Sequence, residues 1–412
     1  MSVPIVAIVG MGGYAAFHRK AVQRAVEDGR AAHTAQVVPP SDHEPFANEL
    51  KLMHEAGIRT YDSLRELLAA ERSGLDLVCV PTGIPLHRVM TTTILEAGCN
   101  VLVEKPAAGC IQDVDAMIRA RDSSGCRALV GFQHIYRGAT QHLKTALLSG
   151  RFGKILRVRG FGCWPRPPAY YARNSWAGEL AAGDTWVLDG PHNNALAHSV
   201  NLMCFLAGST QGSSAEPVSI QAELYRAKPI RTTDTVCLQA QTREGAEIFF
   251  AVSHSTEENL DPAFAVDTED AVLDIGFDNA VTIHWKDDRA DEELITAAEV
   301  REASSVMGAI ASVGGDRSAA VCELEVARAQ TLCACGSFES SPVRSLPTAL
   351  HVAGPDETLA IDGMSAAVQT AFAEGRSFSD LGLDWAVAGE QIDLANYSYF
   401  PTYRTPTELL YD

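Results

Sequence analysis

The strongest restriction on the fold of this sequence comes from an apolar segment that runs directly into a glycine-rich turn. Residues 5–9 read Ile-Val-Ala-Ile-Val, and Gly10-Met11-Gly12-Gly13-Tyr14-Ala15 follows at once, before a helix-like stretch. This order matches the G-x-G-x-x-G/A pattern of a dinucleotide-binding strand–turn–helix unit. Gly10 permits the tight turn, Gly12 lets the backbone approach a pyrophosphate, and Ala15 keeps helix and strand close together. The helix N-terminus then faces the phosphates.

The residues that follow this turn repeat the same alternation of short apolar runs and helix-like stretches. The pattern predicts strands at 5–9, 34–38, 75–80, 100–104 and 127–132, and helices at 14–28, 44–56, 62–73, 85–98 and 111–124. The strands are apolar throughout, as expected where helices cover both faces of a parallel sheet. We therefore predict an α/β fold whose first domain, residues 1–132, is a Rossmann domain with a doubly wound parallel sheet.

The pattern changes beyond this region, where strands follow one another without intervening helices. It predicts helices at 139–149, 191–207 and 360–376, and strands at 154–164, 217–225, 233–241, 246–254, 270–276 and 279–285. Residues 290–350 read as mixed helix and loop, and the tail 390–412 as an aromatic loop. We predict a C-terminal α+β domain, residues 133–412, with a large, mostly antiparallel, open-faced sheet for substrate binding and oligomerisation.

The charge balance excludes several classes of partner. Asp and Glu number 52 against 33 Lys and Arg, which gives a formal net charge of −19. Such a surface repels nucleic acids and anionic membranes, so neither is an expected partner. The sequence shows no secretory leader pattern and no apolar run of transmembrane length, which favours a cytoplasmic location. The ten cysteines lie mostly in apolar runs, as reduced buried thiols do, and no spacing indicates a metal site.

The end of the second predicted strand lacks a residue that this fold often carries. An acidic side chain there would hold the ribose 2′-hydroxyl, but the sequence reads Val37-Val38-Pro39-Pro40-Ser41-Asp42. Prolines stand where the acidic residue is expected, so the sequence does not exclude NADP as the cofactor. We expect NAD, because residues 37–47 contain no Arg or Lys to hold a 2′-phosphate, and we expect Ser41 to contact the cofactor.

A lysine follows the fourth of these predicted strands. Residues 100–104 end in Glu104-Lys105-Pro106, and the carboxyl end of a parallel strand lies at the ligand-binding edge of the sheet. An exposed turn lysine is the simpler interpretation. However, Leu102-Val103 precedes this turn, and Pro81-Thr82-Gly83, Leu86-His87 and Glu96-Ala97-Gly98 come earlier. Together with the glycine turn, this combination resembles the Gfo/Idh/MocA family of oxidoreductases, named after glucose–fructose oxidoreductase and inositol dehydrogenase.

The resemblance implies roles for several residues. Lys105 would contact the substrate hydroxyl that is oxidised and stabilise its developing oxyanion, because a cation beside an incipient alkoxide binds more strongly as charge develops. NAD would contact the glycine turn (Gly10, Met11, Gly12, Gly13, Tyr14 and Ala15), and Thr82, His87, Glu104, Lys105 and Gln133 would line its ribose and nicotinamide. The free face of the C-terminal sheet would pack against another subunit, which implies a homodimer or homotetramer.

Members of this family carry an Asp-x-x-x-His pattern on a helix that ends in Leu-x-Gly. Counting back from Gly208 places His198 on the family histidine, and puts Asn194 and Asn201 where aspartates are usual. On a helix these three residues share one face, which suggests either a lined pocket or a buried, satisfied polar cluster. Asp189 and His192 form a competing register for the Asp-x-x-x-His pattern, but they lie three residues apart instead of four. We expect Asp189 or Gly190 to be the N-cap of this helix and Pro191 to be its first helical residue. Asn194 would orient His198 without adding charge.

An aromatic segment, residues 164–176, precedes this helix. Aromatic faces combined with Arg and Asn side chains suit sugars, and the group expected to bind substrate is Tyr171, Arg173, Asn174, Trp176, Asn194 and Asn201. A loop packed by its own aromatic side chains is the alternative.

These expectations combine into an NAD(P)-dependent dehydrogenase. It would transfer a hydride between nicotinamide and a CH–OH carbon of a sugar, sugar derivative or cyclitol, with His198, Lys105 and Asn194 in the catalytic roles. Two alternatives stay open. One is a redox-neutral NAD-dependent glycosidase that oxidises its sugar transiently. The other is a non-catalytic dinucleotide-binding protein.

Overall fold

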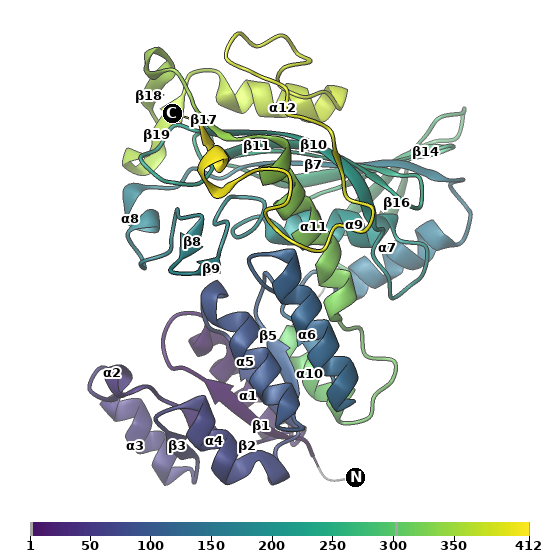
Figure 1. The fold of residues 1–412 in the computed structure, drawn as a ribbon. Helices are drawn as coiled ribbons and strands as arrows, with labels where there is room; N and C mark the ends of the chain where they lie inside the picture. Colours follow the sequence, from purple (N-terminus) through teal and green to yellow (C-terminus); the bar gives the residue numbers. More distant parts are fainter. Residues whose placement is uncertain (1–2, 301–303, 412) are drawn as a thin grey trace. The chain divides into compact units, whose positions relative to one another are not determined.

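The computed structural model of the protein describes residues 3–300 and 304–411 (Figure 1). The chain divides into two compact units. The first comprises Met1–Ala108, Asp113–Arg137 and Glu302–Ala327, and the second comprises Gly109–Gln112, Gly138–Arg301 and Arg328–Asp412. A single boundary at residue 132 therefore misses a late segment that returns to the first unit.

The first unit is built on a parallel sheet of six strands in the order β3-β2-β1-β4-β5-β6. Its strands are β1 (Ile5–Val9), β2 (Ala32–Val37), β3 (Arg59–Tyr61), β4 (Leu77–Val80), β5 (Asn100–Val103) and β6 (Ala128–Val130). Its helices are α1 (Ala15–Glu27), α2 (Pro40–His43), α3 (Ala47–Glu55), α4 (Leu64–Glu71), α5 (Ile84–Glu96), α6 (Ile111–Ser124), which begins in a segment of the second unit, and α10 (Ser305–Val313). The predicted doubly wound parallel sheet is confirmed, and its order is that of Rossmann domains.

Two features of this sheet differ from the sequence prediction. The edge strand β3 was not predicted, because Arg59–Tyr61 is only three residues long and polar at its start. Helix α10 packs on the sheet through Val306, Ala309 and Ile310, which join the core with residues of β1, β4 and β5. Apolar burial therefore brings α10 back to the first unit, although more than 160 residues of the second unit precede it.

The second unit contains an eleven-stranded sheet, mostly antiparallel, in the order β16-β15-β14-β13-β7-β12-β11-β10-β17-β21, with β20 paired to β10. Its strands are β7 (Ile155–Cys163), β10 (Pro217–Arg226), β11 (Thr235–Thr242), β12 (Glu247–Ser253), β13 (Leu260–Thr268), β14 (Ala271–Ile275), β15 (Val281–Trp285), β16 (Glu292–Ile295), β17 (Val343–Ser345), β20 (Ile392–Asp393) and β21 (Leu410–Tyr411). Two small hairpins are β8 (Ala181–Ala182) with β9 (Thr185–Trp186) and β18 (His351–Ala353) with β19 (Leu359–Ile361). The helices are α7 (Gly138–Leu148), α8 (Pro168–Tyr171), α9 (Ala197–Ala207), α11 (Leu324–Ser340), which begins in the first unit, and α12 (Met364–Glu374).

Strand β7 lies in the middle of this sheet, between β13 and the parallel strand β12, and both of its faces are covered. On one face, Val158 belongs to the core that contains Met203 and Val200 of α9. On the other face, α12 packs against β7 and β12, and its Met364 and Val368 share a core with Phe249 of β12 and other apolar side chains (Figure 1). The expected open face is therefore not free of helices over the central strands, and assembly through this sheet stays a prediction.

Helix α12 is held on the sheet by charged groups at both ends. The carboxylate of Glu257 accepts hydrogen bonds from the backbone N–H groups of Gly363 and Ser365 at the start of the helix. The guanidinium of Arg159, on β7, donates to the carbonyl oxygen of Phe372 at 2.9 Å near the end of the helix. An anion at the N-terminus and a cation at the C-terminus both complement the helix dipole. The helix is thus fixed in position as part of this unit.

Helix α9 is shorter than predicted, which changes the position of Asn194. The helix begins at Ala197 with Leu196 as N-cap, and residues 191–196 form successive turns. Pro191 is therefore not the first helical residue, and neither Asp189 nor Gly190 is the N-cap. The polar side chains of this segment bind one another and nearby backbone instead of continuing the helix: Asn193 donates to the carbonyl oxygen of Val187 at 3.0 Å.

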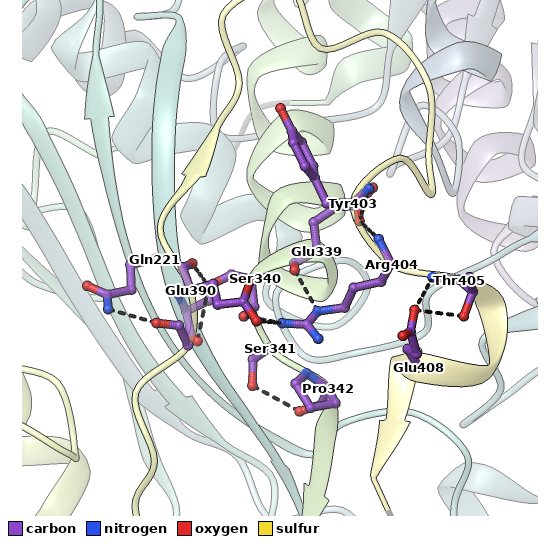
Figure 2. A network of polar contacts seen from close by, with 12 residues as sticks. Gln221, Glu339, Ser340, Ser341, Pro342, Glu390, Tyr403, Arg404, Thr405 and Glu408 are labelled. Carbon is purple, nitrogen blue, oxygen red and sulfur yellow. Dashed lines mark hydrogen bonds and ion pairs between the residues drawn. The ribbon is translucent and has the colours of Figure 1, made fainter.

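The last part of the chain is attached to α11 by the buried carboxylate of Glu339 (Figure 2). It accepts hydrogen bonds from the backbone N–H groups of Tyr403 and Arg404 at 2.9 and 3.0 Å, and from the hydroxyl of Tyr397 at 2.6 Å. The guanidinium of Arg404 donates in turn to the carbonyl oxygen of Glu339 at 2.6 Å. The tail that was predicted as an aromatic loop is thus ordered by one carboxylate.

A buried lysine closes the C-terminal end of α9. Lys144, on α7, has no exposed surface, and its ammonium donates to the carbonyl oxygens of Phe205 at 2.6 Å, Leu206 at 3.3 Å and Gly208. The carbonyl oxygens at the end of a helix lack intrahelical donors; that of Phe205 also accepts from the N–H of Gly208 at 3.1 Å, and the lysine supplies a donor to all three.

We predict that Lys144→Met lowers the free energy of unfolding by about 2–3 kcal/mol, because buried carbonyl groups lose their donor while the apolar stem is kept. Urea denaturation measures this effect. Lys154→Met is the matched control, since Lys154 is exposed. An equal, small effect of both substitutions would contradict the capping role.

Candidate active site

The glycine turn of the first unit has the geometry that its sequence predicts. Gly10 has a φ of 91° and Gly13 a φ of 55°, both in the left-handed region that favours glycine. The N–H of Gly10 donates to the carbonyl oxygen of Val37 at 2.9 Å. The amide of Gln36, fully buried in β2, donates to the carbonyl oxygen of Gly10 at 2.6 Å. The turn is thereby tied to the end of β2.

Several polar groups around this turn fit a dinucleotide. Within residues 3–300 and 304–411, the backbone N–H groups of Gly12 and Gly13 receive no acceptor, and the buried hydroxyl oxygen of Thr82 has no hydrogen-bond partner. A Cβ on Gly12 would lie 3.2 Å from the ring of Phe46, so a larger residue here would be crowded by that side chain. Free N–H groups beside the start of α1 suit a pyrophosphate. Met11 is buried, which leaves only its backbone for the cofactor, whereas Ser41 is exposed on α2.

The carboxylate of Glu104 organises the end of β5. It accepts a hydrogen bond from Nε2 of His18 at 2.9 Å and another from the backbone N–H of Lys105 at 3.1 Å, and both acidic and imidazole side chains are buried. Gly131 passes so close that a Cβ there would lie 2.5 Å from Oε1 of Glu104. The backbone N–H of Lys105 is therefore held by the side chain of the residue that precedes it, Glu104.

Tyr14 and Gln133, both predicted to contact the cofactor, lie beside each other. The Tyr14 hydroxyl donates to the side-chain oxygen of Gln133 at 3.3 Å. Burial, with a smaller contribution from the charge of Glu104, raises the pKa of Tyr14 to about 12, so the phenol stays protonated. These contacts bring residues from β1, β5 and the end of β6 to one edge of the sheet.

His87, which was predicted to line the ribose and nicotinamide region, lies inside the protein next to Thr82 and Pro106. It is fully buried on α5, with Nδ1 2.8 Å from the carbonyl oxygen of Pro106 and Nε2 3.0 Å from that of Thr82. Burial lowers its pKa, which keeps the ring neutral. Both ring nitrogens thus face backbone carbonyl oxygens, and the neutral ring donates its one N–H to one of them.

In the second unit, the aromatic segment folds back on itself. The guanidinium of Arg173 lies 3.8 Å from the centre of the Tyr170 ring and 5.5 Å from that of Trp176. Asn174 accepts from the backbone N–H groups of Trp176 at 3.1 Å and Ala177 at 2.8 Å, so its side-chain oxygen builds the turn. The structure brings Arg173 and Trp176 together, and the Asn174 oxygen accepts hydrogen bonds from the backbone of the same segment.

Asp189 connects this segment to the turns before α9. Its carboxylate is 1% exposed; Oδ2 accepts from the backbone N–H of Gly178 at 2.7 Å, and Nη2 of Arg173 lies 3.6 Å away. Oδ1 accepts from the side-chain amide of Asn194 at 2.5 Å. Asn194 and Arg173, predicted as one substrate-binding group, therefore share a single buried carboxylate.

The remaining predicted residues of this unit lie on α9. His198 is partly exposed in the first turn of the helix, and Asn201 is buried one turn further on. His192, of the competing register, is fully buried, lies 5.6 Å from the ring of Phe338, and burial lowers its pKa to about 4. His192 is thus neutral and enclosed by the core.

Three contributors were missed at the level of sequence. His18 and Gln36 interrupt otherwise apolar faces, and a polar residue inside a strand or on a buried helix face was a usable signal. Asp189 was considered only as a helix cap or as part of the competing register with His192, because its partners Gly178 and Asn194 lie on opposite sides of a hairpin that the sequence did not predict.

Comparison with protein families assigns both parts of the chain. Residues 5–132 match the oxidoreductase family with an NAD-binding Rossmann fold, and residues 140–274 match the Gfo/Idh/MocA C-terminal domain. The chain belongs to the Gfo/Idh/MocA oxidoreductase family. The first unit is accordingly an NAD-binding Rossmann domain, and the resemblance inferred from the glycine turn and Glu104-Lys105-Pro106 is confirmed.

Individual relatives are more distant. A 1,5-anhydro-D-fructose reductase of Ensifer adhaerens is 34% identical over 96 residues, 23% of this chain and 28% of the reductase. An inositol 2-dehydrogenase/D-chiro-inositol 3-dehydrogenase of Halalkalibacterium halodurans is 24% identical over 200 residues, 48% of this chain and 51% of that enzyme. The matched part thus spans between about a quarter and a half of these relatives. The WlbA dehydrogenase of Chromobacterium violaceum, solved with NADH and UDP-GlcNAcA, shares the fold, with a TM-score of 0.67, 24% identity, and coverage of 82% of this chain and 93% of that one.

Two structural features are absent from the part of the chain that the structure describes. Among the helices there, none combines the length and apolar character needed to cross a membrane. Nor do three or more His, Cys, Asp or Glu side chains of these residues gather where they could hold a metal ion.

We predict that Gly131→Ala weakens NAD binding and lowers the free energy of unfolding by about 1–3 kcal/mol, because its methyl group must displace the Glu104 carboxylate. Titration of NAD by isothermal calorimetry and urea denaturation measure the two effects. Gly138→Ala is the matched control, since a Cβ there meets nothing within 4 Å. If Gly131→Ala and Gly138→Ala behave alike, the packing of Glu104 does not matter for the site.

Proposed function

We propose that the protein transfers a hydride between NAD and a CH–OH carbon of a sugar, sugar derivative or cyclitol. The observation that carries this proposal is the position of Lys105: it follows β5 on the same sheet edge as the glycine turn, with its backbone held by Glu104. Family membership and the names of the reductase and inositol dehydrogenase relatives support the substrate class. Bound NAD would supply the hydride acceptor, and the chain supplies binding, orientation and proton handling.

Lys105 provides the positive charge of the proposed reaction. Oxidation of an alcohol develops negative charge on its oxygen as the proton leaves, and an ammonium group beside that oxygen stabilises the transition state more than the ground state. Glu104 fixes the backbone of Lys105, and His18 satisfies the other carboxylate oxygen. The carboxylate of Glu104 is thereby engaged on both oxygens and holds the backbone of Lys105 in place.

His198 accepts the proton in the proposed reaction and returns it in the reverse direction. Imidazole is a common general base, and the partly exposed position of His198 on the first turn of α9 lets a ligand reach it. Arg173 and Trp176 of the aromatic segment would bind the substrate through stacking and hydrogen bonding, with Tyr171 and Asn201 completing the group. Asn194 would orient His198.

The test is a spectrophotometric screen in which the purified protein is mixed with NAD or NADP and a panel of sugars, cyclitols and glycosides. NADH absorbance is expected to rise with one class of polyol. Release of an aglycone without NADH accumulation would replace this proposal by the redox-neutral glycosidase. NAD binding without turnover in either assay would replace it by the non-catalytic dinucleotide-binding protein.

For the substrate so identified, we predict that Lys105→Ala lowers kcat by about 100- to 1,000-fold, because the developing oxyanion loses its cation. NAD affinity is expected to change much less. Lys51→Ala is the matched control, since the Lys51 side chain is 77% exposed on α3. Normal turnover by Lys105→Ala would show that this lysine has no part in the chemistry.

A further inference from the structure

The aromatic segment, residues 164–176, forms a ladder in which aromatic rings and guanidinium groups alternate. The guanidinium of Arg166 lies 5.2 Å from the centre of the Trp164 ring and 4.9 Å from that of the Tyr170 ring. The guanidinium of Arg173 lies 3.8 Å from the centre of the Tyr170 ring and 5.5 Å from that of Trp176. Consecutive members of this series are therefore in cation–π contact.

The two arginines of the ladder differ in their acidic partners. Nη2 of Arg173 lies 3.6 Å from the buried carboxylate of Asp189. Within residues 3–300 and 304–411, no carboxylate oxygen lies within 4 Å of the guanidinium of Arg166, and its buried Nε has no hydrogen-bond partner. Burial raises the pKa of the Tyr170 phenol, which therefore stays neutral and does not balance the charge. Arg166 is thus a partly buried cation of the ladder without an acid beside it.

The backbone of Arg166 is fixed by the end of β12. The N–H of Trp164 donates to the carbonyl oxygen of Ser253 at 3.1 Å, and that of Arg166 donates to the carbonyl oxygen of His254 at 3.2 Å. Nδ1 of the buried His254 ring lies 2.8 Å from the carbonyl oxygen of Trp164 and, since a carbonyl only accepts, donates its N–H there. The side chain of Arg166 therefore starts from a backbone that is held on both sides.

The other charged groups around this backbone have partners of their own. The ammonium of Lys228, a residue only 6% exposed, donates to two backbone carbonyl oxygens and to a hydroxyl. The carboxylate of Asp234 accepts from two backbone N–H groups at 2.8 and 3.0 Å. That of Asp261 accepts from the indole N–H of Trp164 at 2.9 Å. None of these carboxylates lies close enough to form an ion pair with Arg166.

A guanidinium in this setting suits one class of ligand. Contact with aromatic rings restricts the guanidinium without using its N–H donors in ion pairs. A carboxylate or a phosphate accepts two such N–H groups side by side, whereas a neutral hydroxyl does not match this fork. The flanking rings of Trp164 and Tyr170 offer apolar faces to the carbon skeleton of a sugar. Because the whole chain carries a formal net charge of −19, a local cation is needed to hold an anionic ligand.

We propose that the ladder binds an anionic sugar, and that Arg166 selects this ligand by binding its carboxylate or phosphate group. The inference rests on the proposed function, because it names the class of sugar that is to be oxidised. The rest of the ladder, where Arg173 is paired with Asp189, binds the uncharged part of the sugar. Arg166 is thereby a specificity-determining residue that the predicted substrate-binding group did not include.

The test uses the full-length protein and sugars that differ in charge alone or nearly so. The panel contains glucose, glucuronate and glucose 6-phosphate, together with galactose, galacturonate and galactose 6-phosphate. NADH absorbance in the presence of NAD gives kcat/KM for each sugar. Isothermal calorimetry in the presence of NADH, which cannot accept a hydride, gives the affinity for each sugar without turnover. The carboxylate and phosphate members distinguish the two sources of the anionic group.

Three variants accompany the wild type. Arg166→Gln removes the cation, and Arg166→Lys keeps the charge but loses the planar fork. Arg151→Gln is the matched control, because the guanidinium of Arg151 also packs against two rings, those of Phe152 and Trp285, at 5.2 and 5.3 Å. Unlike Arg166, however, Arg151 forms an ion pair with Glu292. Arg166→Lys keeps the test decisive if Arg166→Gln does not fold.

We expect the wild type to bind an anionic sugar about tenfold to a hundredfold more tightly than its neutral counterpart, the range of a charged hydrogen-bonded contact. Arg166→Gln is expected to lose this preference, Arg166→Lys to keep part of it, and Arg151→Gln to keep all of it. Binding that depends on Arg166 without NADH formation would support this inference and reject the hydride-transfer function. Equal binding of charged and neutral sugars would overturn the inference, as would no binding of any anionic sugar. A charge preference that survives in both Arg166 variants would also overturn it.

Discussion

A carboxylate withdrawn from water is stable only where donors surround it, and this requirement organises both units of the protein. In the first unit, Glu104 takes donors from His18 and from the backbone at Lys105. In the second, Asp189 takes donors from Gly178 and Asn194. Each carboxylate thereby fixes the segment that presents a residue proposed to act on the substrate. Removing either one leaves donors unpaired as well as removing a charge.

The same requirement fixes the parts of the second unit that lie outside the proposed site. Glu257 and Arg159 hold α12 at its two ends, and Glu339 holds the tail against α11. Between these polar contacts, apolar side chains of α12 cover β7 and β12. The central strands of the large sheet therefore lie between α9 on one face and α12 on the other, and His198 is carried by a helix whose underlying sheet is buried on both sides.

Much of this fold was predictable, because apolar runs bury strands regardless of distant context. The runs at residues 5–9 and 100–104 became β1 and β5 within one residue, and the glycine turn adopted the backbone angles its sequence requires. Strand β13 was missed because Leu260–Thr268 contains Pro262 and charged residues, which a strand tolerates here only through its pairing with β7 and β14. The start of α9 was also wrong. Local propensity placed Pro191 at a helix start, whereas contacts of Asp189 and Asn193 with distant backbone stabilise turns instead.

The candidate site residues also divide into those that local sequence predicts and those that depend on contacts made only after folding. Lys105 could be located from its own strand and motif, because the carboxyl end of a parallel strand is a local property. The partner of Asn194 could not, because Asp189 reaches it only after the chain between Gly178 and Asp189 folds back as the hairpin β8–β9. The asparagine at position 194, where the family pattern has an aspartate, was thus visible in the sequence. Its contact with the carboxylate of Asp189 was visible only in the structure.

The central claim is that Lys105 and His198 both take part in one step of the proposed reaction. A double-mutant cycle of kcat with Lys105→Ala, His198→Asn and the combined variant tests it most directly. If both residues serve one proton-transfer and oxyanion-stabilising step, the combined variant will be about as slow as the slower single variant, because groups that act as a unit are not additive. If the two effects multiply to within about twofold, the residues act independently and the account is contradicted.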